Sequence, residues 1–352
     1  MTPGPDAPTI FYANGSPRRL DLARDVNRAL LTAATLPDRL EHLPELAKYE
    51  CFALDGHWHQ AAAHDARHDG TKRWLWATST AWTCAATNSA TWPWGKACMN
   101  TTGACAKRLK PSGLRQAVPK GRRVLLIYDK AGLDFAYWKR CRQECAVYFL
   151  SRVKEGMVYD WLESRIVDHR DQRNRGVTED RVVMTREGGP MRIIYYTEPE
   201  QGRGYEFLTN EMALPPGVLA ELYRRRWEVE KVFDELKNKL GQKKAWGTSQ
   251  VAKAAQGQRV ALTHNLLLLY ETRLEENHGV SNEAEDERRQ ERVKQLEKSA
   301  RQAGREISSL RLSARRATQR SVKFVRWLRQ ALRENLAEGD AVPRLTSLYA
   351  TL

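Results

Sequence analysis

The sequence contains no apolar run long enough to span a membrane. Its best candidate, Val260 to Tyr270, is interrupted by Thr263, His264 and Asn265. Its six cysteines have no regular spacing, which is typical of reduced thiols in a cytosol rather than of a disulfide framework. The N-terminal residues also lack the architecture of a signal peptide. We therefore expect a cytoplasmic protein.

Acidic residues are too few to balance the basic ones. The chain has 58 Lys and Arg against 43 Asp and Glu, a formal net charge of +15 and a pI near 9.6. A positive field of this size favours a polyanionic partner, nucleic acid first and an anionic membrane second.

Charge is missing altogether from residues 74–95, although 29% of the chain is charged, and this stretch holds five of its eleven tryptophans. A tryptophan-rich binding loop is one interpretation. Our preferred hypothesis is that residues 72–106 are translated out of frame. Permissible codons for the start of this stretch, shifted by one base, can encode a plausible β-strand.

Two apolar runs each deliver an aspartate. Residues 51–54 read as a short buried strand ending at Asp55, and Val124–Tyr128 as a second one ending at Asp129. A helix over 133–143 and another buried strand over 146–150 follow. This alternation predicts an α/β sheet.

The remaining segments complete a predicted domain plan. Residues 1–48 form an N-terminal helical segment with two short helices divided near Pro37. Residues 49–152 and 209–275 form the main α/β domain. The turn and strand pattern of 153–208 predicts a β-rich insertion, and 276–352 a charged helical C-terminal region with an amphipathic helix over 322–336.

Residues 220–240 contain no glycine or proline and read as one long helix. At 100° per residue, Tyr223, Arg226, Glu230 and Lys237 fall within about 60° of one another, beside a separate apolar face. A solvated, salt-bridged face explains this stripe as well as a functional site does, since Arg226 and Glu230 are also an i,i+4 pair.

The spacing of these four residues resembles the Tyr-Arg-Glu-Lys signature of a large group of DDE-type insertion-sequence transposases. Residues 54–57 (Leu-Asp-Gly-His) resemble the group's first aspartate motif, and 127–132 resemble its second, although Lys130 stands where many members carry Arg. The resemblance implies a ribonuclease H-like mixed sheet flanked by helices, with the β-rich insertion before the last catalytic helix and a helical C-terminal tail.

The same resemblance implies a catalytic and metal-binding triad of Asp55, Asp129 and Glu230. Three neighbouring carboxylates would repel one another unless cations bind, and all-oxygen ligands suit two Mg²⁺ or Mn²⁺ ions. Tyr223, Arg226 and Lys237 would contact DNA at the transposon ends. DNA, as transposon ends and as target, would be the partner rather than a membrane, and the protein would associate with the nucleoid. Synapsis of two ends would require at least a homodimer.

Two other functions remain open from the sequence. One is a metal-dependent nuclease on a ribonuclease H-like fold, which the Tyr-Arg-Glu-Lys spacing disfavours. The other is a catalytically impaired DNA-binding remnant, in which residues 72–106 have spoiled the sheet. Salt-sensitive DNA binding without cleavage would distinguish the remnant.

The frame hypothesis predicts what the coding DNA contains. We expect a single-base shift near codon 72 to give a strand-forming sequence in place of the tryptophan-rich one, and the original frame to resume before about codon 107. Sequencing the gene tests this prediction. Codons that encode no such strand in either shifted frame would contradict it.

Overall fold

The structure is a computed structural model. It describes residues 16–33, 40–59, 67–68, 72–73, 76–83, 89–91, 120–130, 133–199, 202–226, 249–279, 297–304 and 320–350, with a few isolated positions between them. The chain forms two compact units. One comprises residues 1–237 and 241–265, and the other residues 238–240 and 266–352.

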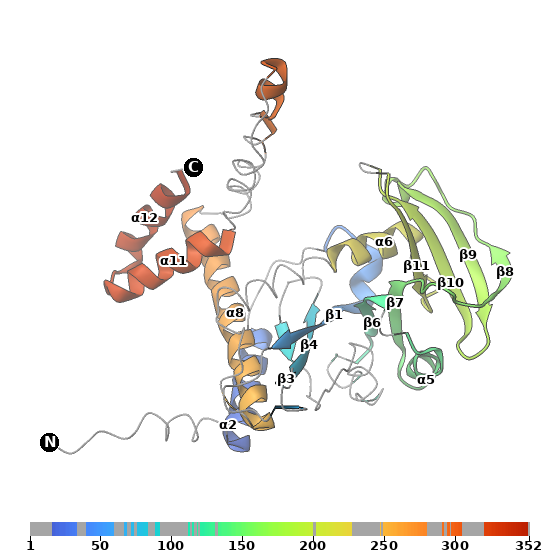
Figure 1. Ribbon diagram of the computed structural model, residues 1–352, viewed down its shortest axis with the longest axis horizontal. Coiled ribbons are helices and arrows are strands. Elements are labelled where there is room, and N and C mark those ends of the chain that lie inside the picture. The colour runs from blue at the N-terminus through green and yellow to red at the C-terminus, as the bar shows by residue number, and fades with distance from the viewer. Residues whose placement is uncertain are drawn as a thin grey trace. The chain divides into compact units, whose positions relative to one another are not determined.

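The first unit contains a mixed β-sheet. Five of its strands have the order β5-β4-β1-β6-β7 (Figure 1). These strands are β1 (Tyr49–His59), β4 (Trp76–Thr83), β5 (Ser89–Thr91), β6 (Arg123–Tyr128) and β7 (Val147–Arg152). The first three along the chain pair antiparallel, whereas β6 joins β1 and β7 joins β6 in parallel. This order and these directions confirm the predicted ribonuclease H-like sheet.

Four further strands extend this sheet beyond β7 in the order β11-β10-β9-β8. They are β8 (Asp160–Ser164), β9 (Val177–Thr185), β10 (Gly189–Thr197) and β11 (Gly204–Thr209). All are antiparallel to their neighbours, and β11 pairs directly with β7. The predicted β-rich insertion is therefore hydrogen-bonded onto the main sheet and continues it (Figure 1).

Helices α5 (Phe135–Cys145) and α6 (Pro216–Arg225) cover opposite faces of the sheet. Leu208 belongs to the core that packs on α5, whereas the ring of its neighbour Phe207 lies 4.8 Å from that of Tyr223 on α6. Successive side chains of a strand point to opposite faces, so the two helices are separated by the sheet.

Aromatic packing dominates the core on the α5 face. Trp138 is 1% exposed, stacks on Tyr128 at 5.1 Å and lies 5.2 Å from Phe149. Asp134 caps α5 by accepting a hydrogen bond from the Tyr137 amide, and Ala146 ends the helix in the left-handed conformation.

Helix α2 (Pro17–Ala33) and the first part of α8 (Gln250–His278) also belong to this unit. Leu20 packs against Ala254 and Ala255, and Asn265 donates a buried hydrogen bond to Asn27. The remaining described elements here are two 3₁₀ turns, η1 (Pro44–Lys48) and η3 (Gln172–Asn174), and the short β2–β3 pair (Arg67–His68 and Lys72–Arg73).

The second unit contains the end of α8 with α11 (Arg320–Arg333) and α12 (Glu338–Ala350). Phe324 and Trp327 pack with Leu274 and Leu345, and the Trp327 indole donates to the carbonyl of Ala341. None of the helices that the structure describes is long and apolar enough to cross a membrane.

Two boundaries differ from the sequence-based prediction. The strand predicted to end at Asp55 continues to His59, because β4 pairs with it antiparallel over Phe52–His59. The second of the two N-terminal helices predicted around Pro37 is replaced, over its described part, by the short turn η1. In both places the deciding factor is tertiary, and local pattern does not reveal it.

Two tryptophans provide a test of this core. Replacement of Trp138 by Ala should lower the free energy of unfolding by about 3–5 kcal/mol, because it opens a cavity among buried rings. The control is Trp161→Ala on β8, where the side chain is 63% exposed and the change should stay within about 0.5 kcal/mol. Urea denaturation measures both, and equal effects would contradict this description of the core.

Candidate active site

Two aspartates lie at the same edge of the sheet. In the parallel pairing of β1 with β6, Leu54 is opposite Tyr128, so Asp55 and Asp129 are each the next residue along. Asp129 directly follows β6, whereas Asp55 lies inside β1 opposite Thr80 of β4. The predicted adjacency of the two positions is present in the backbone.

The Asp129 side chain is partly buried, and its Oδ1 accepts a 2.7 Å hydrogen bond from the Lys130 amide. Its charge is one of the influences that raise the pKa of Tyr223, after the larger effect of burial, while Arg226 and Arg152 act in the opposite direction. Asp129, Arg226 and Arg152 therefore all lie near enough to Tyr223 to influence its pKa. In the parallel pairing of β6 with β7, Ile127 is opposite Leu150, which brings Asp129 level with Arg152.

Helix α6 supplies Tyr223 and Arg226 to this group of residues. Pro215 and Pro216 precede and begin the helix, and Val218, Leu219 and Leu222 are fully buried on its apolar face. Tyr223 is 3% and Arg226 5% exposed. The Arg226 guanidinium lies 5.4 Å from the centre of the Tyr223 ring, a cation–π arrangement.

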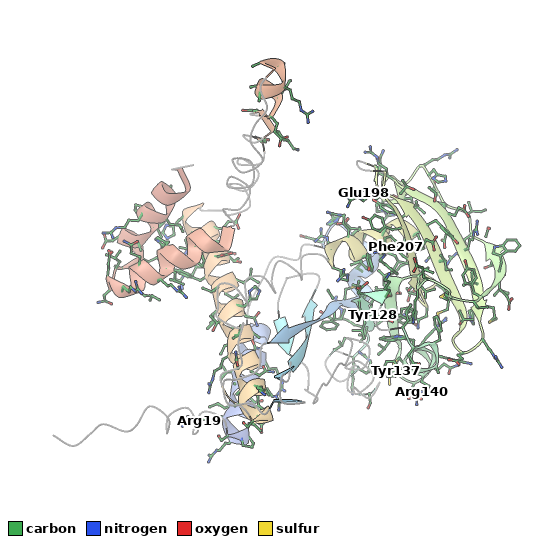
Figure 2. The ribbon with its side chains drawn as sticks, viewed as in Figure 1. Arg19, Tyr128, Tyr137, Arg140, Glu198 and Phe207 are labelled. Carbon is green, nitrogen blue, oxygen red and sulfur yellow. The ribbon has the colours of Figure 1, made fainter. Side chains whose placement is uncertain are left out.

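The aromatic cluster next to Tyr223 comes from the inserted strands. Phe207 on β11, labelled in Figure 2, contacts Tyr223 and stacks on Tyr205 at 6.1 Å. The guanidinium of Arg152, the last residue of β7, lies 5.5 Å from the Tyr205 ring. The sheet edge that carries Asp129 therefore also carries a cation held by aromatic packing.

An open cleft of about 410 Å³ is lined in part by Lys130, the residue that follows Asp129. Side chains and backbone from β7, β9, β10 and β11 line it, together with Lys130; they are Lys130, Arg152, Val153, Glu155, Thr178, Tyr195, Tyr196, Thr197, Gly204, Tyr205 and Glu206. Its mixture of cations, carboxylates and tyrosines suits a polar ligand.

Four of the six predicted site residues are thus placed at or beside one sheet edge: Asp55 by its backbone, and Asp129, Tyr223 and Arg226 with their side chains. Glu230 and Lys237 lie outside the described residues. No group of three or more His, Cys, Asp or Glu residues that could hold a metal ion occurs within the described part of the chain.

Sequence reasoning missed Arg152 and the aromatic pair Tyr205 and Phe207. A signal for Arg152 exists, since it ends the strand that follows the Asp129 strand. Parallel neighbours bring their carboxyl ends to the same edge. No comparable signal marks Tyr205 and Phe207, because their contact with α6 depends on β11 pairing with β7.

Comparison with known proteins agrees with this geometry. Residues 106–266 match the family model described as "Transposase DDE domain". The matched stretch covers a little under half of the chain. It includes Asp129, Tyr223, Arg226, Glu230 and Lys237, and it begins after Asp55.

No curated protein matches the sequence. Among solved structures, the chain is similar to a piggyBac transposase in a synaptic complex with hairpin DNA, at 11% sequence identity and a TM-score of 0.36. The similarity covers 85% of this chain, which spans 57% of that protein.

Because Arg226 is buried, we expect it to contribute more to stability than the exposed arginine near the end of α6. Arg226→Ala should lower the free energy of unfolding by about 2 kcal/mol, because it removes a desolvated cation from the Tyr223 ring. The matched control is Arg224→Ala: that side chain is 67% exposed and pairs with Glu221, so its loss should cost less than about 1 kcal/mol. Urea denaturation compares them, and a larger effect for Arg224 would contradict the arrangement.

Proposed function

We propose that this chain is a DNA transposase of an insertion sequence, which cuts and joins the ends of its element by phosphoryl transfer. The observation that carries this proposal is the adjacency of Asp55 and Asp129 at one edge of a ribonuclease H-like sheet whose later part matches the transposase DDE domain family. The net charge of +15 supports DNA as the partner.

Asp55, Asp129 and Glu230 would hold two divalent cations, Mg²⁺ or Mn²⁺. The described part of the site fits such ions: Asp129 is only partly buried, and carboxylate oxygens are the ligands that these hard cations prefer. When bound, the two ions would activate the attacking oxygen and stabilise the leaving oxygen of an in-line displacement.

Arginine side chains of this chain would bind the DNA phosphate. Arg152 and Arg226, like Asp129, lie near enough to Tyr223 to influence its pKa, and guanidinium groups can bind phosphate oxygens in a bidentate manner. Tyr223, Arg226 and Lys237 are the proposed contacts to transposon-end DNA. Because Tyr223 and Arg226 are almost fully buried here, such contact requires both side chains to become more exposed.

A homodimer is the assembly that we propose for synapsis, since two ends must be held together. The corresponding location is the cytoplasm, where the protein would associate with the nucleoid. Absence of a membrane-spanning helix among the described residues is compatible with this location.

Metal-dependent cleavage tests the proposal. A labelled DNA fragment that carries this gene's own flanking sequences should be cut at the flanks in Mg²⁺ or Mn²⁺. Glu230→Gln should abolish cleavage, because it removes one charged ligand while keeping the side-chain shape. The control is Glu228→Gln, two residues away and about 160° around the same predicted helix, which should cut at the wild-type rate.

Other results would favour the other functions. Metal-dependent cutting with no preference for the flanks would support a nuclease. DNA binding without cleavage in any form, weakening steeply with salt, would support the impaired remnant and direct attention to the reading frame of residues 72–106.

A further inference from the structure

An ion pair is buried between strands β9 and β10, on the face of the sheet that α6 covers. Arg192 lies between Met191 and Ile193, which both belong to the core on the α5 face, so its side chain points to the other face. There its Nε and Nη2 donate to the two carboxylate oxygens of Asp180 at 2.7 and 2.6 Å. The two side chains are 1% and 2% exposed.

Burial of this pair costs free energy of desolvation. The remaining hydrogen bond of Arg192 connects the pair to the segment before α6. The Nη1 of Arg192 donates a 2.6 Å hydrogen bond to the backbone carbonyl of Leu214, two residues before α6 begins. Arg165 makes a parallel contact, donating from its Nη1 to the carbonyl of Met212 at 2.6 Å. Two arginines therefore form hydrogen bonds to the segment that precedes α6.

A third contact fixes the first turn of the helix. Pro215 provides no side-chain cap, and the amide of Gly217 donates instead to Oδ1 of Asn174 at 3.0 Å. Gly217 also lies so close to Arg173 that a Cβ there would be 1.9 Å from its carbonyl oxygen. The start of α6 consequently has very little freedom to shift.

The other end of the same helix carries Tyr223 and Arg226 into the surroundings of Asp129. A helix held at its first turn transmits any tilt there to its last turn, because the peptide bonds between them form one rigid element. Besides the direct contact of Phe207 with Tyr223, the inserted strands can thus influence the candidate site through the orientation of α6, which residues 212–217 set.

We propose that Arg192, held by Asp180, is a positioning residue. It sets the orientation of α6 and thereby the placement of Tyr223 and Arg226 beside Asp129. Arg165 and Asn174 assist it. The inference deepens the proposed function, but its structural part, the control of α6 by Arg192, stands without it.

The first test replaces both partners together, as Asp180→Leu with Arg192→Met. Apolar replacement of a whole buried ion pair is often tolerated, whereas removal of one partner leaves an uncompensated charge. We expect a wild-type unfolding midpoint, but faster amide hydrogen exchange over residues 214–226, because the Leu214 anchor is gone. The cleavage rate at saturating DNA should fall by about 100-fold with little change in DNA affinity.

The matched control is Glu179→Gln, also on β9, which breaks the more exposed pair with Arg181 and leaves the α6 anchors intact. It should exchange and cleave like the wild type. The conservative Arg192→Lys variant keeps the charge but not the three-way contact, so its exchange and its cleavage rate should lie between those of the wild type and the double variant.

Hydrogen exchange separates the two proposals, since it requires no DNA. Faster exchange in the double variant supports the anchor even if the wild-type chain never cuts DNA, in which case only the proposed function fails. Unchanged exchange and unchanged cleavage in a stable double variant would overturn the anchor. Should that variant unfold, Arg192→Lys tests the same contact with the Leu214 carbonyl, and exchange and cleavage identical to those of the wild type would refute the proposal.

Discussion

Parallel pairing between β1 and β6 is the constraint on which the candidate site depends. Residues 124–128 of β6 are almost completely inaccessible to solvent, so this strand cannot slip against its neighbours without moving a full row of apolar side chains into the wrong layer. With that register fixed, Asp55 and Asp129 have to be neighbours. Close placement of two acidic positions is thus a consequence of core packing rather than of any attraction between them.

The surroundings of Asp129 show how the fold tolerates a carboxylate at this edge. Arg152 ends the next strand, and Arg226 enters from α6, so positive charge comes from two separate elements. Each guanidinium is held against a tyrosine ring, Arg152 by Tyr205 and Arg226 by Tyr223. Aromatic contact holds each guanidinium in place while the arginine keeps its positive charge.

Local sequence patterns predicted the parts of the fold that are locally determined. The apolar run before Asp129, the helix after it and the strands β9, β10 and β11 were all foreseeable, since each has its own turn signals and periodicity. Strand β8 was not, because its side chains are all exposed and show no alternation. Helix α12 falls within the predicted helical C-terminal region, but its bounds were not predicted, and it contains Pro343. The continuation of β1 past Asp55 depends on β4, a partner supplied from elsewhere in the chain.

The candidate site, like the fold, has parts that local sequence predicts and parts that depend on tertiary contacts. Strand-end aspartates and a four-residue stripe are visible in the sequence, and the positions of Asp55, Asp129, Tyr223 and Arg226 follow from them. The roles of Phe207, Arg152 and Arg192 are not visible, because each depends on contacts between distant segments. Arg192 is the clearest example. An arginine within the run from Met191 to Tyr196 looks like an interruption until Asp180 and the Leu214 carbonyl are placed around it.

Direct hydrogen bonding of β11 to β7 has a consequence for how such a protein can diverge. The inserted strands are attached through residues Phe207–Thr209 of β11, which pair with Leu150–Arg152 of β7, and not through their turns. Turns such as the one between β10 and β11 can therefore lengthen or change composition at little energetic cost, as surface loops generally do. Such changes leave the pairing of β11 with β7 in place.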